Sequence, residues 1–84
     1  MSSNQQGELG VTDRVATVFR QTFGKKHAFE ATLKRTDVPV WTSMKHVEFI
    51  IALEKAFNVR FDGADATDMV SIPVVLERLG KKLT

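Results

Sequence analysis

The strongest constraint on the fold comes from the segment between Ser43 and Phe57, which contains neither glycine nor proline. Its apolar residues recur at helical spacing in two adjacent stripes: Phe49, Ile50, Leu53 and Phe57 in one, and Met44, Val47 and Ile51 in the other. Thr42 or Ser43 can cap the start of this helix. Because one stripe is enough to bury a helix in a small bundle, the second is either additional core or an exposed contact surface.

Two further segments have helical periodicity, one before and one after the segment already described. The first extends from about Leu9 to Phe23 and carries a single apolar stripe that ends before Gly24. Between the second and third helices, the residues from Ala64 to Met69 predict one short helical turn. Ser71 can cap a last helix, whose apolar stripe comprises Ile72, Val75, Leu76, Leu79 and Leu83. No segment has the alternation of a strand, so we predict an all-α fold, a small four-helix bundle of three main helices and one short helix.

The length of 84 residues allows one domain. Residues 1–8 are polar and predict a flexible N-terminal tail, which leaves residues 9–84 as the helical domain. The connection over residues 24–41 is long for a compact domain, and connections of this length are often functional. Its apolar side chains predict that it is pinned across the bundle: Phe29, Leu33, Val38, Val40 and Trp41.

Composition and charge exclude several functional classes. The chain has no cysteine, so disulfide frameworks, thiolate zinc sites and cysteine nucleophiles are excluded. No apolar run is long enough to span a membrane and the N-terminus lacks the pattern of a secretory signal, so we expect a cytoplasmic protein. The net charge of +2 arises from basic and acidic residues that alternate along the chain, which argues against nucleic-acid binding.

The chain offers few groups for catalysis or metal binding, so we expect neither an enzyme nor a metal site. Ser43 and His46 are close on one helix, but no acid is placed to orient the histidine. His27 is the other histidine, and metal binding needs three or four converging ligands. Three aspartates lie close together in the sequence but lack the pattern of a calcium loop: Asp62, Asp65 and Asp68. We expect them either to form a solvated face or to be partners for the dipole of the short helix.

Ser43 is the most informative single residue, because it follows a long loop and opens a helix. A hydroxyl in this position is exposed, and the backbone N–H groups of a first helical turn favour an anion such as a phosphate ester. From the residues alone two roles stay open for Ser43, a plain helix cap and a site of modification.

The segment over residues 39–59 resembles the acyl carrier protein family. The residues that match the family's motif in kind and spacing are Ser43, Met44, Val47, Glu48, Leu53, Glu54 and Phe57. The resemblance implies a small monomeric four-helix bundle in which a phosphopantetheinyl transferase attaches 4′-phosphopantetheine from coenzyme A to Ser43. The thiol of that arm would hold an acyl group as a thioester and present it to acyl-activating or acyl-transferring enzymes of lipid or secondary-metabolite synthesis.

The same resemblance implies roles for residues around the serine. Partner enzymes of the family recognise the helix that follows the modified serine, which implies partner binding by Met44, Val47, Glu48 and Ile51. Positions that help to enclose the acyl chain in the family correspond to Phe61, Ala66 and Met69. Ordinary core packing stays open as the alternative role of the apolar residues in both groups.

Two departures from the family pattern bear on the specific function. Thr42 stands where the family usually has aspartate, and basic residues offset the negative charge that is typical of its members: Lys34, Arg35, Lys45 and Lys55. Because complementary potentials set the choice of partner, we expect a specialised carrier with dedicated partners rather than a housekeeping fatty-acid carrier. The alternative is an unmodified helical protein-interaction module with a carrier-like fold.

Overall fold

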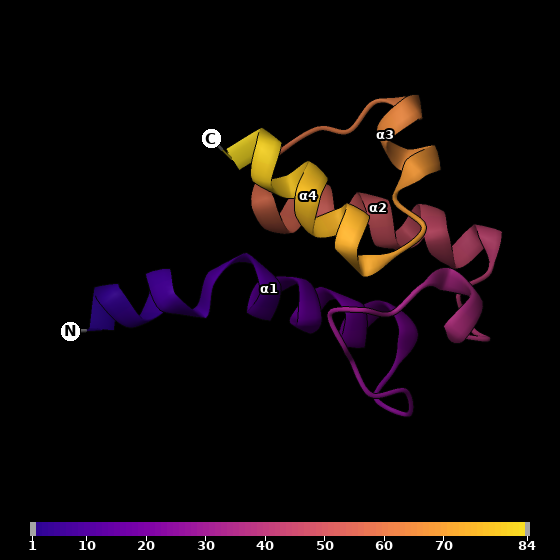
Figure 1. Ribbon diagram of the computed structural model, residues 1–84, viewed down its shortest axis with the longest axis horizontal. Coiled ribbons are helices and arrows are strands. Elements are labelled where there is room, and N and C mark those ends of the chain that lie inside the picture. Colours follow the sequence, from indigo (N-terminus) through magenta and orange to yellow (C-terminus); the bar gives the residue numbers. More distant parts are fainter. Residues whose placement is uncertain (1, 84) are drawn as a thin grey trace.

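The computed structural model describes residues 2–83, and side chains from residue 10 onward. Within this range the chain forms four α-helices and one short 3-10 helix: α1 (Ser2–Phe23), η1 (Arg35–Asp37), α2 (Ser43–Phe57), α3 (Gly63–Asp68) and α4 (Ile72–Leu83). Residues 2–83 contain no strand, and one isolated antiparallel bridge joins Lys34 to Ser71. The predicted all-α bundle of three main helices and one short helix is therefore confirmed (Figure 1).

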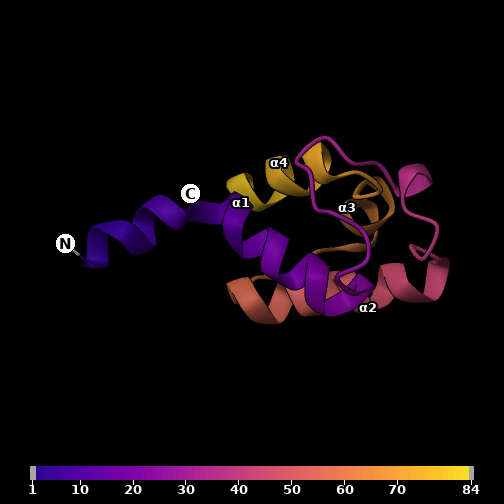
Figure 2. The same ribbon diagram turned by 90° about the horizontal axis from the view of Figure 1, so that it is seen from below.

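Helix α1 is interrupted at Gly10, whose φ of 62° and ψ of −171° are not helical. After this break α1 packs against α2 and α4, and it buries Val15 and Phe19 completely. Before it, the helical turns of residues 2–9 point away from the other helices (Figures 1 and 2). The predicted start of the packed helix, about Leu9, coincides with the break. The mobility predicted for residues 1–8 stays a prediction, and residue 1 lies outside the described range.

Helix α2 has the predicted bounds and lies at the centre of the hydrophobic core. Asn58 ends it in the left-handed conformation, with φ 55° and ψ 49°. Its buried face is the first of the two predicted stripes: Phe49, Ile50, Leu53 and Phe57. Phe49 contacts Phe23 and Trp41 with ring centroids 5.2 and 5.5 Å apart, so the core around the start of α2 is aromatic.

The connection over residues 24–41 is pinned to the core, as predicted. Leu33, Val38 and Trp41 are buried, and Phe29 is partly buried against the same core. The prediction was wrong for Val40, which is 47% exposed. A turn causes this difference: the Trp41 N–H donates to the Val38 carbonyl at 2.9 Å, so both neighbours face the core while Val40 faces outward.

Helix α4 begins as predicted. The Ser71 hydroxyl accepts from the Val74 N–H at 3.4 Å, and the Ser71 carbonyl accepts from the Val75 N–H at 3.0 Å. The stripe of α4 is buried at Ile72, Val75 and Leu79 and partly buried at Leu76. Leu83 was predicted to belong to this stripe and is exposed, because it lies in the last turn of α4 beyond the core.

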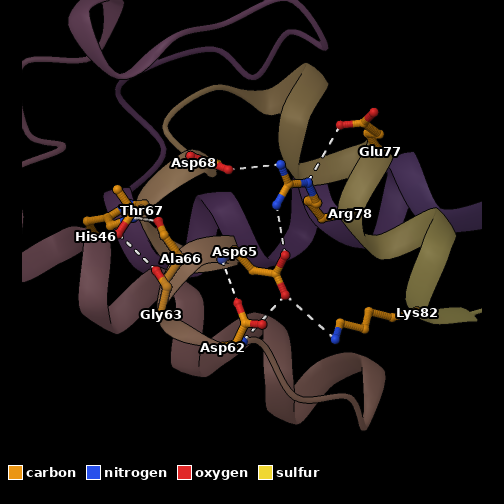
Figure 3. A network of polar contacts seen from close by, with 10 residues as sticks. All are labelled: His46, Asp62, Gly63, Asp65, Ala66, Thr67, Asp68, Glu77, Arg78 and Lys82. Atoms are coloured by element: carbon orange, nitrogen blue, oxygen red, sulfur yellow. Dashed lines mark hydrogen bonds and ion pairs between the residues drawn. The ribbon is translucent and has the colours of Figure 1, made fainter.

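Helix α3 is fastened to α4 by ion pairs, which we call the Arg78 cluster and which Figure 3 shows. Arg78 contacts Asp65 at 2.8 Å, Asp68 at 2.9 Å and Glu77 at 3.7 Å, and Lys82 lies 3.6 Å from Asp65. The hydrogen bond from Arg78 lowers the pKa of the Asp65 carboxyl against the opposing effect of burial. Asp65 is thus a partner of α4 rather than part of a solvated face. The other predicted role, a partner for the dipole of the short helix, is confirmed: Asp62 caps α3 by accepting from the Asp65 N–H at 2.8 Å, and Asp65 lies in the first turn of α3.

Candidate functional site

Ser43 is the first residue of α2, and its hydroxyl does not cap the helix. The cap is Thr42, whose side-chain oxygen accepts from the Lys45 N–H at 3.2 Å. Of the two roles that the sequence left open for Ser43, the plain helix cap is therefore wrong. Ser43 is exposed, and its Oγ accepts a hydrogen bond from Nη2 of Arg35 at 3.1 Å. This leaves an accessible hydroxyl with a fixed neighbour.

Arg35 reaches Ser43 from η1 and is held in place by both its backbone and its side chain. Its N–H donates to the carbonyl of Val70 at 2.8 Å, and its Nε donates to the carbonyl of Trp41 at 2.9 Å. Arg35 forms no ion pair with any described residue. We call Arg35, the Trp41 carbonyl and Ser43 the Arg35 cluster.

An open pocket of about 420 Å³ lies beside this cluster. Two segments that are distant in the chain line it, one at η1 and one just before α4: Lys34, Arg35, Thr36, Val70 and Ser71. Backbone hydrogen bonds hold these segments together, from Arg35 to Val70 and from the Ile72 N–H to the Leu33 carbonyl, each 2.8 Å long. Arg35 therefore both lines the pocket and contacts the hydroxyl of Ser43.

His46 is committed to structural hydrogen bonds. The indole N–H of Trp41 donates to its Nδ1 at 3.0 Å, so the imidazole proton is on Nε2, which donates to the Ala66 carbonyl at 2.7 Å. His46 therefore joins the loop before α2 to α3, and neither ring nitrogen is available as a base for Ser43. His46 is only partly exposed, which fits this structural role.

The second apolar stripe of α2 is exposed beside Ser43. Met44, Val47 and Ile51 are 75%, 56% and 45% exposed, which excludes the core as their place, while their role as a contact surface stays a prediction. Glu48 lies on the same surface, and its carboxylate pairs with Lys45 at 3.4 Å. The predicted partner-binding residues thus form one accessible face. We call Met44, Val47 and Ile51 the exposed apolar face.

The three predicted acyl-pocket residues lie in and around the core. Met69 is completely buried, whereas Phe61 and Ala66 are partly buried and pack against the same core. None of them lines the 420 Å³ pocket, nor a second pocket of about 300 Å³ that contains Glu54 and Val59. Their role in enclosing an acyl chain stays a prediction, since each has the contacts of an ordinary core residue.

Two contacts that organise the site were not predicted from the sequence. Arg35 was noted only for its charge, and its contact with Ser43 spans a turn that no local pattern predicts. His46 meets a carbonyl from a different helix, α3. A signal for Arg35 was present nonetheless, because a basic residue stood in a long connection that leads directly to the serine.

Comparison with other proteins gives no family assignment: no family model, curated protein or solved structure matches the chain. Among the residues that the structure describes, no three potential metal ligands of the histidine, cysteine or carboxylate type lie together. No helix within residues 2–83 is both long and apolar enough to cross a membrane. The function must therefore be argued from the Arg35 cluster and its surroundings.

Proposed function

We propose that this protein is a specialised acyl carrier protein. Ser43 carries a 4′-phosphopantetheine arm and the protein presents acyl thioesters to partner enzymes of lipid or secondary-metabolite synthesis. The observation that best supports the proposal is the Ser43 hydroxyl, which is exposed at the start of α2, is not used as a cap and is held by Arg35. Modification by a phosphopantetheinyl transferase, action as a monomer and a cytoplasmic location belong to the same proposal.

The surroundings of Ser43 fit the attachment chemistry. Oγ would bond to the phosphorus of coenzyme A that bears pantetheine, the bond from that phosphorus to the departing 3′,5′-ADP would break, and the hydroxyl proton would pass to the transferase. Because Arg35 donates its hydrogen bond to Oγ, the hydroxyl keeps its own proton free to leave. The bound arm supplies a thiol for thioester formation, which this chain lacks because it contains no cysteine.

The exposed apolar face supports a role in presenting cargo to other proteins. Its residues begin directly after Ser43 and extend along α2, so a protein that binds this face also reaches the modified residue. An apolar centre with a charged rim, here Lys45 and Glu48, is suited to a weak and transient interface. Since the rim carries both signs of charge, it favours partners other than those that recognise a uniformly acidic helix.

The proposal is tested by the mass of the intact protein after incubation with coenzyme A, magnesium and a broad-specificity phosphopantetheinyl transferase. We expect one phosphopantetheinyl increment on the wild type and none on Ser43→Ala. Ser71→Ala is the matched control, because it removes a serine that caps α4, and it should still be modified. An established carrier in the same tube shows that the transferase is active. If that carrier is modified while both the wild type and Thr42→Asp stay unmodified, the proposal is contradicted.

The second candidate is an unmodified interaction module with the same helical fold, and the exposed apolar face is the observation that favours it. That face needs no arm to bind a partner. The two candidates differ in what Ser43→Ala does in cells. The substitution should abolish the function of a carrier, whereas a module should keep its function, since Thr42 rather than Ser43 caps the helix.

A further inference from the structure

Arg35 carries a positive charge that the described part of the protein does not neutralise. Both acceptors of its guanidinium are uncharged, the carbonyl of Trp41 and the hydroxyl of Ser43. The nearest residue of α2 with a cationic side chain, Lys45, is paired with Glu48 instead. An anion attached at Ser43 would therefore meet the guanidinium of Arg35 without displacing a carboxylate.

The geometry of Arg35 suits a phosphate ester on Oγ in particular. Nη2 is already 3.1 Å from Oγ, so phosphate oxygens bonded to the same centre as Oγ come next to the guanidinium. Guanidinium groups bind phosphate oxygens through paired N–H donors, with hydrogen bonds stronger than those between neutral groups. The bond from Nε to Trp41 fixes the side chain beforehand, which reduces the entropy lost on pairing.

We infer that Arg35 is a positioning residue that pairs with the phosphate ester on Ser43 and directs the attached arm into the neighbouring pocket of Lys34, Thr36, Val70 and Ser71. The inference rests on the proposed function for the nature of the arm. The pairing of Arg35 with the phosphate rests only on the contact that the structure shows. We place the arm in this pocket because Arg35 forms part of the pocket wall. An arm that leaves the phosphate at Arg35 therefore starts at the edge of the pocket.

The first test uses phosphoserine, incorporated genetically at position 43, so that no transferase is needed. A ³¹P NMR titration measures the second pKa of this phosphate, whose ordinary value is about 6. In the wild-type background a neighbouring guanidinium should lower the pKa by about 0.5 or more. Arg35→Gln should return it toward its ordinary value, and Arg35→Lys should fall between the two. Arg60→Gln is the matched control, because Arg60 lies beyond the opposite end of α2, and it should change nothing.

The fold is expected to survive these substitutions, because the backbone bond from Arg35 to Val70 does not involve the side chain. Far-ultraviolet circular dichroism of each variant checks this, and Arg35→Lys provides a second variant that retains the charge. A phosphate pKa that is the same in the wild type, Arg35→Gln and Arg35→Lys would overturn the inference. The inference would also be overturned if Arg60→Gln changed the phosphate pKa as much as Arg35→Gln, since any positive charge of the protein would then act on the phosphate without a specific contact.

The second test follows the arm itself in the protein modified with coenzyme A. Amide signals of residues 34–36 and 70–71 should shift on modification of the wild type, and these shifts should decrease by at least half in Arg35→Gln. Shifts confined to the first turn of α2 would refute the placement of the arm. Failure of the wild type to accept the arm, together with a phosphoserine pKa that depends on Arg35, would reject the carrier function while keeping the phosphate contact.

Discussion

Arg35 and Arg78 place the same guanidinium group in opposite electrostatic surroundings. Arg78 is paired with Asp65 and Asp68 at 2.8 and 2.9 Å, and it fastens α3 to α4. Arg35 donates to a carbonyl and to the hydroxyl of Ser43, and it forms no ion pair with a described residue. The charge of Arg78 is therefore neutralised within the fold, whereas the charge of Arg35 stays available to an anion. Their contacts, rather than residue type, distinguish the arginine whose charge is neutralised within the fold from the arginine whose charge is not.

The largest effect should come from reversing the charge of Arg35. Arg35→Glu places a carboxylate beside Ser43, where it repels the diphosphate of coenzyme A, so the rate of phosphopantetheinylation should fall at least about tenfold, which corresponds to about 1.4 kcal/mol. Arg78→Met, assayed beside it, should leave the rate per folded molecule within about twofold. The measurement is the initial rate of mass increment. Equal losses in both variants would remove the distinction between the two arginines.

A smaller effect should separate Ser43 from the residue that caps its helix. Thr42→Ala removes the acceptor of the Lys45 N–H and should lower the free energy of unfolding by about 1 kcal/mol. Ser43→Ala should change it by less than about 0.5 kcal/mol, because Ser43 is exposed and does not cap α2. Urea denaturation at pH 7 measures both values. A larger loss for Ser43→Ala would show that the Arg35 cluster serves stability.

The smallest effect concerns the pH dependence that the Arg78 cluster gives to stability. Arg78 holds the pKa of Asp65 below its ordinary value of 3.8, and Asp65 raises the pKa of Arg78. The Asp65 contribution is therefore fully present above about pH 4 and is lost as the pH falls through the lowered pKa. The contribution of Arg78 is lost only in strong alkali. The effect is limited because burial of the Asp65 carboxyl opposes the lowering of its pKa.

Arg78→Met tests this pH dependence. Urea denaturation between pH 7 and pH 2.5 should show a shallower loss of unfolding free energy in the variant than in the wild type, and a lower value than the wild type at pH 7. Arg35→Gln is the matched control, since Arg35 holds no carboxylate and its removal should leave the acid slope unchanged. If unfolding free energy falls with acid as steeply in Arg78→Met as in the wild type, the lowered pKa of Asp65 does not depend on Arg78.

Local patterns predicted most of the fold. The cap before the apolar stripes and the last apolar residue, Phe57, predicted the bounds of α2, and the cap at Ser71 predicted the start of α4. Hydrophobic periodicity placed the buried face of α2 correctly, because that face depends on spacing alone. The errors lie where periodicity continues past the core, as at Leu83, or where a turn reverses the direction of a side chain, as at Val40.

The candidate site was less predictable, because its contacts join segments that the sequence does not place together. Ser43 could be identified from its position after a long loop, but only the contact of Thr42 with Lys45 showed that Ser43 is not the helix cap. Arg35 approaches Ser43 through a 3-10 helix whose position depends on the bond from its backbone to Val70. Asp65 finds its partner on α4, so its pairing could not be read from α3 alone.

Trp41 makes the neighbourhood of Ser43 optically visible. It is the single tryptophan of the chain, it is 2% exposed, and its carbonyl accepts the hydrogen bond that fixes Arg35. Trp41 lies two residues before the serine in sequence, and its ring stacks on the ring of His46 with centroids 6.1 Å apart. Because the emission of an indole moves to longer wavelength when water reaches it, intrinsic fluorescence reports any opening of this loop. Any event that changes the access of water to Trp41 can thus be followed in real time without attaching a dye.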